Sequence, residues 1–242
     1  MAQVDLNIDL GELPGEPPEL FALATVANIA CGGHAGDRAS MARAVSFALT
    51  RGTRLAAHPS YPDRAGFGRV PMAMAPTDLA AAVEEQCAAL QSIARKLGYP
   101  IARVKPHGAL YHDAAADPAI AAALVEGAAR GLAVPTAELT VIGPPRSARG
   151  AALLDAALRA GARYAREGFA DRAYRADGTL VPRSEAGALI TDASACARQA
   201  LTLASAGALE TICVHGDTPG AVAIAGRVRD ALTQAGLLQG AG

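Results

Sequence analysis

Apolar runs alternate with helix-like stretches along most of the chain. The first run, residues 4–10, alternates strictly, which predicts a strand with Asp5, Asn7 and Asp9 on one face. Six further apolar runs predict strands at residues 26–31, 54–57, 102–105, 139–143, 164–168 and 211–215. Helical spacing predicts helices between Asp37 and Gly52 and at about residues 77–97, 114–129, 147–160, 192–206 and 219–235.

Strand–helix alternation of this kind predicts a parallel sheet with right-handed crossovers. Seven such units indicate the α/β class and a closed or nearly closed seven-stranded parallel βα barrel, similar to a TIM barrel. A doubly wound open sheet is the alternative. The sequence shows no linker and no second core, so residues 1–242 are expected to form a single catalytic domain.

The strand predicted at residues 102–105 carries unusual polar residues. At period two, Arg103, Lys105 and His107 share one face, and Pro106 marks the end of the strand. Buried parallel strands are normally apolar on both faces, and an unpaired buried cation is costly. Lys105 is therefore expected either in a buried ion pair, with Asp5 or Asp9 as the candidate partners, or against a bound anion.

Polar residues follow other predicted strands at equivalent positions, and four of the five histidines are among them. They are Asp9, Asn28, His34, His58, Lys105, His107, Glu167, His215 and Asp217. Because the carboxyl ends of barrel strands form the active-site face, these residues are expected to converge. Two alternatives stay open. Residues 4–10 could form an edge strand with one solvent-exposed face. Asp37 could be a helix cap, a catalytic residue or both.

Net charge, apolar run length and cysteine spacing limit the kinds of partner and the cellular compartment that we expect. The chain has 242 residues, a formal net charge of −1 and no tryptophan, so it lacks the basic surface that nucleic-acid binding requires. No run reaches the ~18 apolar residues of a membrane span, and residues 1–5 do not resemble a secretory signal. The four cysteines are widely spaced, which is typical of reduced thiols in a cytoplasmic enzyme.

The converging residues allow more than one chemistry. Asp9, His58 and His107 could hold a divalent metal that polarises a carbonyl or activates water. The same side chains could act without metal, as a general acid and base. Lys105 and Arg69 suit an anionic substrate or a phosphate. The sequence has no nucleophile elbow and no Walker-type phosphate loop, so any nucleotide site would be unconventional.

Seven sequence blocks together resemble the LamB/YcsF family over essentially the whole chain. They are VDLNIDLGE, ANIACGGHAGD, HPSYPDRAGFGR, VKPHGALY, EGFADRAY, LVPR and CVHGD, in this order. The resemblance implies a βα barrel of the glycoside hydrolase/deacetylase type. It also implies the A subunit of an ATP-dependent 5-oxoprolinase, which cleaves 5-oxoproline to L-glutamate together with subunits B and C. ATP, with its Mg²⁺, is the implied cofactor.

The resemblance also carries over individual residues. The proposed catalytic set is Asp9, His34, Asp37, His58, Lys105, His107 and His215. The proposed substrate- or phosphate-binding set is Asn7, Arg69, Asp171, Arg172 and Asp217, of which the resemblance marks Asp171, Arg172 and Asp217. The chain departs from the family pattern at Ile8, where cysteine is usual, at Val70, where a second arginine is usual, at His112, where asparagine is common, and in a shorter stretch at residues 201–210. The departures argue against a catalytic thiol at position 8 and for weaker anion contacts beside Arg69.

Three functions are compatible with these residues. The first is the ATP-dependent lactamase subunit, the second a metal-dependent deacetylase-like amidohydrolase that needs no ATP, and the third a non-catalytic barrel within a complex. Whether ATP would bind this chain or a partner is open, as is homo-oligomerisation. We expect the isolated chain to be nearly inactive, and we expect Cys31 and Cys213 to be structural.

Overall fold

The computed structural model describes residues 3–146 and 150–240. Its strands are β1 (Asp5–Leu10), β2 (Val26–Ala30), β3 (Arg54–His58), β4 (Arg103–Val104), β5 (Thr140–Gly143), β6 (Arg163–Phe169) and β7 (Thr211–His215). Its helices are α1 (Glu19–Leu23), α2 (Arg38–Thr50), α3 (Pro76–Lys96), α4 (Gly108–Ala116), α5 (Pro118–Leu132), α6 (Ala152–Arg159), α7 (Ala193–Ser205) and α8 (Ala221–Gln234), with a 3₁₀ turn at Thr136–Glu138. All seven predicted strands are present.

The strands form a closed, all-parallel barrel in sequence order, and β1 closes it by pairing with β7 as well as β2. The barrel prediction is confirmed, and both the open sheet and the edge-strand reading of residues 4–10 are wrong. The register places Asp9 level with Asn28 on one side and His215 on the other. Polar residues from the first, second and last strands therefore lie at one level of the barrel.

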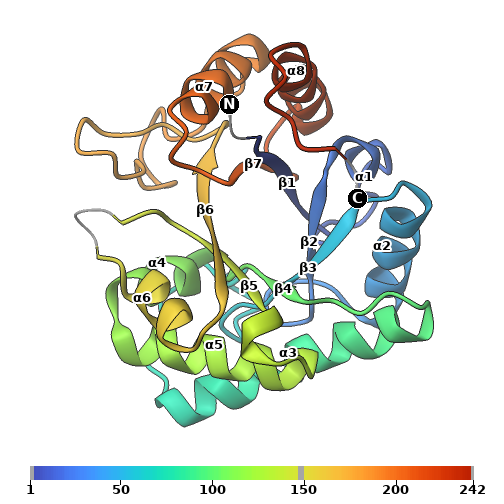
Figure 1. Cartoon of the computed structure of the whole chain (residues 1–242), viewed down its shortest axis with the longest axis vertical. Coiled ribbons are helices and arrows are strands. Elements are labelled where there is room, and N and C mark those ends of the chain that lie inside the picture. Colours follow the sequence, from blue (N-terminus) through green and yellow to red (C-terminus); the bar gives the residue numbers. More distant parts are fainter. Residues whose placement is uncertain (1–2, 147–149, 241–242) are drawn as a thin grey trace.

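The helices lie outside the strands, with α7 and α8 on one side and α3 and α5 on the opposite side (Figure 1). The core between strands and helices is aliphatic and rich in alanine, and Leu6, Ile8, Val83 and Leu90 are fully buried in it. Such packing fixes the strands rigidly, which positions the polar residues at their ends. Within the described ranges, none of the helices has the length and apolarity needed to cross a membrane.

The single helix predicted at residues 114–129 is in fact two helices. Asp117 ends α4 and caps α5, because its side chain accepts hydrogen bonds from the backbone N–H groups of Ala119 and Ile120. Pro118 then occupies the first position of α5, where its missing N–H costs nothing. The helix predicted from residue 147 starts at Ala152 instead, and residues 147–149 lie outside the described part of the chain.

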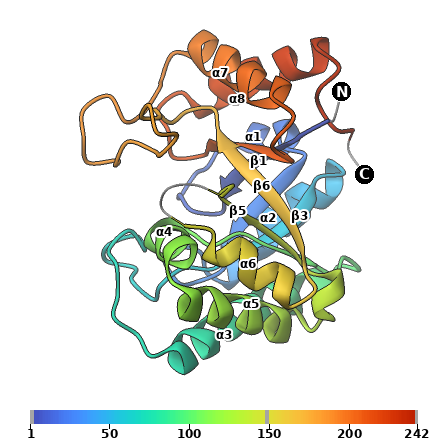
Figure 2. The ribbon, with the colours of Figure 1, turned by 60° about the vertical axis from the view of Figure 1, so that its left-hand side comes forward.

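The segment between β6 and α7, residues 170–192, leaves the barrel as predicted for its turn-rich centre. It folds back on itself through two isolated antiparallel bridges, Arg172 with Leu189 and Tyr174 with Leu180. In both ribbon views the segment projects to one side of the barrel (Figures 1 and 2). Figure 2 also shows β6 crossing in front of the other strands, directly below α7 and α8.

Candidate functional site

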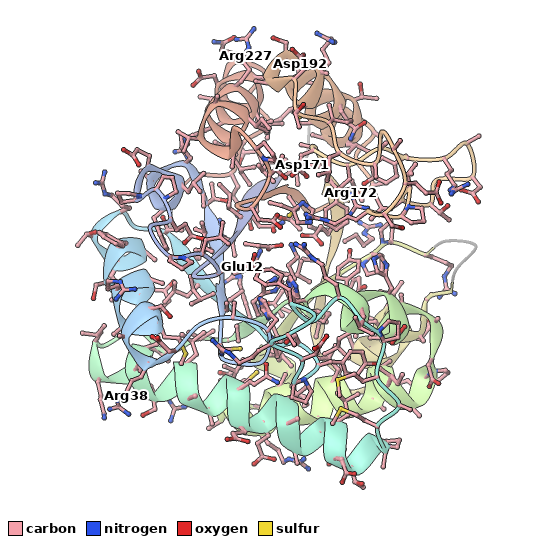
Figure 3. All side chains as sticks on the ribbon, turned by 180° about the vertical axis from the view of Figure 1, so that it is seen from behind. Glu12, Arg38, Asp171, Arg172, Asp192 and Arg227 are labelled. Atoms are coloured by element: carbon pink, nitrogen blue, oxygen red, sulfur yellow. The ribbon has the colours of Figure 1, made fainter. Side chains whose placement is uncertain are left out.

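A cavity of about 530 Å³ opens at the carboxyl ends of the strands. The predicted residues that line it are Asp9, His58, Arg69, Lys105, His107, Arg172 and His215. In Figure 3, Glu12, Asp171 and Arg172 lie toward the middle of the molecule, while Arg38, Asp192 and Arg227 lie on outer helices or at their ends. The structure thus brings together most of the side chains that the sequence placed at strand ends.

Three histidines and one glutamate meet at the wall of this cavity. Glu12 Oε1 lies 3.0 Å from His34 Nε2, 3.2 Å from His107 Nδ1 and 3.6 Å from His58 Nε2. The rings of His34 and His107 stack at 3.7 Å, and His58 stands edge-on to both. All four residues are buried. One ligand atom from each lies within 4.8 Å of the others, so the four could hold one metal ion.

The loops that carry these residues are in close contact. Ala109 N, which follows β4, donates to Gly68 O in the loop after β3. A Cβ atom at Gly108, where φ is +58°, would lie 2.3 Å from that oxygen, so a side chain is excluded. The contact places Phe67 O at 3.0 Å from His107 Nε2. The glycine requirement at position 108 therefore lets the two loops meet in the way that fixes the His107 ring.

The outer ring nitrogens have partners that suit metal ligands. His58 Nδ1 faces Lys105 O at 2.8 Å, and His107 Nε2 faces Phe67 O at 3.0 Å. Because carbonyl oxygens only accept, those nitrogens carry hydrogens, so the inner nitrogens that face Glu12 are the ones that neutral rings would offer to a bound ion. A backbone carbonyl behind a ligand histidine is the usual supporting contact in metal sites. The residues present therefore fit a divalent cation such as Zn²⁺.

Burial and charge act against each other in this cluster. Burial lowers the pKa of His34 to about 4, although Glu12 opposes the shift, and burial likewise lowers the pKa of His107. Burial disfavours the carboxylate of Glu12, but hydrogen bonds from His107 and His34 hold its pKa below the ordinary value. Burial also disfavours a charged His58, but the carboxylate of Asp9 outweighs it and raises the pKa of that imidazole.

The structure groups these side chains differently from the expected metal set of Asp9, His58 and His107, and Asp9 groups instead with Cys213 and His215. The carboxylate that groups with the histidines is Glu12, and His34 completes the cluster. Asp9 Oδ2 lies 3.5 Å from His58 Nε2, while Asp9 Oδ1 is occupied by Lys105 Nζ at 2.8 Å. Glu12 was missed although a signal existed, because it follows β1 as directly as other site residues follow their strands.

Lys105 lies between two carboxylates in the barrel interior. Its Nζ is 2.8 Å from Asp9 Oδ1 and 2.8 Å from Glu167 Oε1, and it also donates to Asn7 Oδ1 and Cys213 Sγ, each at 3.1 Å. Burial disfavours the ammonium, but Asp9 reverses the effect and raises the pKa of Lys105 well above its ordinary value. Lys105 is therefore a charged group in a buried ion pair and also part of the cavity wall.

Asn7 lies deeper than the cavity lining. Its carbonyl oxygen accepts from Lys105 Nζ and, at 2.7 Å, from Asn28 Nδ2. Its amide donates to Thr211 Oγ1 at 2.8 Å. Because the protein occupies both the oxygen and the nitrogen of the Asn7 amide, its place is below Lys105 rather than in direct reach of a ligand.

Asp171 and His215 form a hydrogen-bonded pair, and His215 lines the cavity. Asp171 Oδ1 lies 2.9 Å from His215 Nδ1, and Asp171 Oδ2 accepts from His215 N and Thr218 Oγ1. Burial disfavours the Asp171 carboxylate, but His215 and Thr218 hold its pKa below the ordinary value. Since Asp171 occupies Nδ1, the nitrogen that His215 offers to the cavity is Nε2.

Three arginines surround the cavity mouth, two of them joined by one carboxylate. Asp217 accepts from Arg183 at 3.1 and 3.2 Å and is also in contact with Arg69, whose guanidinium lies over the Phe67 ring. Arg172 donates to Val181 O at 2.6 Å. The predicted anion-binding residues Arg69 and Arg172 thus line the cavity, while Asp217 is a partner of the arginines.

Asp37 is not brought into the cluster. It is exposed at the start of α2, where its side chain accepts from Ser40 N at 2.8 Å and Ser40 Oγ accepts from Asp37 N. The structure places it as a helix cap, one of the two roles that the sequence left open.

The sequence comparisons identify the family of the chain. Residues 4–240 match the profile of the LamB/YcsF family. The chain belongs to the LamB/YcsF family. It is 45% identical, over 98% of its length and 99% of the relative's, to the 5-oxoprolinase A subunit of Streptomyces coelicolor. The corresponding protein of Methylococcus capsulatus is 43% identical over 97% of this chain and 94% of its own. The name of these LamB/YcsF proteins implies further subunits.

Solved structures support the same fold. The LamB/YcsF chain is similar to the lactam utilization protein of Thermus thermophilus, with a TM-score of 0.88 and 36% identity over 99% of this chain and 100% of that one. A family 4 carbohydrate esterase from Streptomyces lividans reaches a TM-score of 0.50 at 13% identity, covering 99% of this chain and 92% of that one. The esterase likeness concerns the barrel fold alone.

Proposed function

We propose that this LamB/YcsF chain hydrolyses the cyclic amide 5-oxoproline to L-glutamate, as the A subunit of a cytoplasmic 5-oxoprolinase. The observation that carries the proposal is the buried Glu12–histidine cluster beside Asp9 and Lys105, in a chain 45% identical to a protein named as the 5-oxoprolinase A subunit. The relatives' name supplies the substrate, and the cavity supplies groups suited to opening an amide.

Ring opening requires four tasks of the protein. Water must add to the lactam carbonyl carbon, the developing oxyanion must be stabilised, the C–N bond must break, and the nitrogen must take up a proton. The proposal assigns proton removal from water to Asp9 with His58, and oxyanion stabilisation to Lys105. It assigns proton delivery to the departing nitrogen to His215, which Asp171 orients through Nδ1.

The substrate carboxylate would bind at the arginine side of the cavity. Arg172 and Arg183 both line it, and Arg69 stands at its edge. Guanidinium groups recognise carboxylates in a planar, two-point manner. Arg183 and Arg69 are already held by Asp217, which fixes their positions before a ligand arrives. Preformed positions reduce the entropy lost on binding.

The Glu12–His34–His58–His107 cluster would hold a divalent cation. When bound, such an ion polarises a carbonyl oxygen or lowers the pKa of water. Glu12 and the three imidazoles would supply the ligands, and Lys105 O and Phe67 O would keep two of the rings in the required tautomer. The cluster also favours the second candidate function, a metal-dependent amidohydrolase that works without ATP.

The proposal places ATP use with the assembled enzyme. A five-membered lactam is a stabilised amide, and transfer of a phosphoryl group from Mg²⁺–ATP to its oxygen, with release of ADP, would make the carbonyl carbon more electrophilic. Water addition and C–N cleavage would then leave an acyl phosphate, and a second water would hydrolyse it to phosphate and L-glutamate. The sequence contains no Walker-type phosphate loop, so we assign nucleotide binding to subunits B and C. The isolated chain is therefore expected to be nearly inactive, and ATP-dependent turnover by the purified chain alone would refute this assignment.

Glutamate release from 5-oxoproline tests the function directly. The assay is run with and without ATP, with and without the partner subunits, and before and after treatment with a chelator. Release only with ATP and partners supports the 5-oxoprolinase subunit. Chelator-sensitive amide hydrolysis without ATP supports the second candidate. Full activity of a complex assembled with the Lys105→Met variant would point to a non-catalytic barrel.

A further inference from the structure

We infer that a second cavity in this chain binds an alkylammonium group. The cavity measures about 560 Å³ and lies between β6, α4 and α7. Its wall is mostly apolar and includes three aromatic rings, those of Tyr111, Phe169 and Tyr174, with the carboxylate of Glu167 among them. None of the roles proposed above uses this cavity.

Glu167 supplies the charge that such a ligand needs. It is 1% exposed, and Lys105 Nζ approaches its Oε1 at 2.8 Å. Burial, with the Glu167 carboxylate nearby, raises the pKa of the Tyr111 hydroxyl. In residues 3–146 and 150–240, no group donates to Glu167 Oε2 at full hydrogen-bonding geometry; the Tyr111 hydroxyl interacts with this carboxylate and is the protein's own candidate donor. A buried carboxylate oxygen without a donor costs free energy unless a ligand or water supplies one.

Lys105 is the ammonium that both Asp9 and Glu167 contact, so these two buried carboxylates share one cation. A second cation beside Glu167 would therefore meet a carboxylate whose charge is only partly compensated.

The aromatic rings suit an ammonium rather than a metal ion. Tyr111 and Phe169 meet edge to face at 5.7 Å, and the Tyr174 hydroxyl accepts from Phe169 N at 2.8 Å. Ring faces attract ammonium groups, and cages of aromatic rings are a known means of binding them. The protein already contains one example of this contact, because Lys105 Nζ lies 5.6 Å from the Phe169 ring centre while it touches Glu167.

Strand pairing explains why Glu167 can be reached from outside the barrel. β5 pairs with β6 only as far as Gly143 with Arg166, and Pro144 and Pro145 then follow. Beyond that point, Glu167, Gly168 and Phe169 pair with β7 alone. The wall of the barrel is therefore open beside this end of β6, and prolines cannot extend the ladder across the gap.

The two cavities are adjacent, because Tyr111, His112, Phe169 and Leu180 line both. Ring opening of a lactam converts an uncharged amide nitrogen into an amine, which takes up a proton and becomes an ammonium. A carboxylate in an aromatic pocket beside the reaction cavity would bind that product group and not the closed ring. This physiological role rests on the proposed function, whereas alkylammonium binding does not.

Calorimetric titration of the full chain with n-butylammonium chloride tests the site, with n-butanol as the uncharged probe of similar size. We expect the ammonium to bind and the alcohol not to bind measurably. Glu167→Gln should weaken ammonium binding about tenfold or more, the loss of one charge-assisted contact. Glu126→Gln, which removes an exposed carboxylate on α5, is the matched control and should bind as wild type.

A second variant guards against misfolding of Glu167→Gln, which disturbs the ion pair with Lys105. Ala208 lies exposed at the cavity lining, and Ala208→Trp fills the space without removing the Glu167 charge. It should weaken n-butylammonium binding, and its indole would be the only one in the chain. Equal binding of alcohol and ammonium, absence of ammonium binding, or wild-type affinity in a folded Glu167→Gln protein would overturn the site.

A separate pair of ligands tests the product role. L-Glutamate and glutarate differ in the ammonium group, so wild type should prefer glutamate and Glu167→Gln should lose that preference. If n-butylammonium binds but glutamate and glutarate bind alike, the product role fails and the cation site stands. If both binding results hold but no glutamate is released by the assembled enzyme, the proposed function fails and the site again stands.

Discussion

Replacing Lys105 with methionine removes the cation that Asp9 and Glu167 share in the barrel interior. Methionine has a similar length and no charge, so the change leaves two buried carboxylates with no ammonium between them. Breaking a buried pair by removing one partner costs about 3–5 kcal/mol. A domain of this size has a free energy of unfolding of about 5–15 kcal/mol, so a weakened but folded protein is expected.

The loss of stability should depend on pH. Burial alone would raise the pKa of Asp9, but Lys105 and His58 hold it well below the ordinary value. A carboxylate with a depressed pKa stabilises the fold above its unfolded-state pKa, and this stabilisation is lost as the pH falls through the folded-state value. Without Lys105 the pKa of Asp9 should rise. The variant's deficit should therefore be largest near about pH 7 and shrink toward about pH 4.

Urea unfolding at several pH values measures the stability, and glutamate release by the assembled enzyme measures the rate. We expect a rate loss of roughly 100-fold or more, as for a lost transition-state contact. Lys96→Met, at the exposed end of α3, changes the chain's only other lysine and is the control. A folded Lys105→Met protein with near-normal turnover would refute the catalytic role, and a pH-independent deficit would refute the ion-pair reasoning.

Three further changes test other parts of the site. Glu12→Gln removes a proposed metal ligand, so Zn²⁺ affinity should fall by more than the roughly 10–100-fold lost when a residue that only supports a ligand is changed. Unchanged metal content after dialysis would contradict the assignment of Glu12 as a ligand. Asp171→Asn should lower kcat roughly 100-fold with little change in KM, because His215 would lose its orienting partner; an unaltered pH–rate profile would argue against it. Cys31→Ser and Cys213→Ser should each keep most activity, since burial raises the pKa of both thiols, that of Cys31 to about 12; activity loss in a folded variant would show a thiol role.

The barrel could be predicted because hydrophobic periodicity is a local property of the chain. Strand ends were found wherever a polar residue followed an apolar run, which is how His58, Lys105 and His215 were identified. The break at Asp117 was missed because alanine-rich sequence continues on both sides and hides the cap. The helix break is signalled by one capping side chain and one proline. Hydrophobic periodicity is judged over a long window, so a signal of two residues is not detected by it.

The partners within the site could not be predicted in the same way. Which carboxylate joins the histidines depends on register and loop geometry, and Glu12 reaches them only because the chain turns after β1. The sequence offered Asp5 and Asp9 as alternatives for Lys105. Asp5 lies at the other end of β1, where it contacts Arg54 instead, and Glu167 comes from a strand more than sixty residues further along the chain.

Closure of the barrel by β1 and β7 has a consequence for synthesis. Of the seven barrel strands, the first to be synthesised pairs with the last, and Val4 adds to this contact through hydrogen bonds with Leu237 and Gln239. Until residues 211–215 emerge, β1 has one unpaired edge. Such an edge can pair with a strand of another chain and so promotes aggregation. Contacts between such distant residues also slow folding. The barrel of a nascent chain therefore cannot close before β7 has emerged, and β1 keeps an unpaired edge until then.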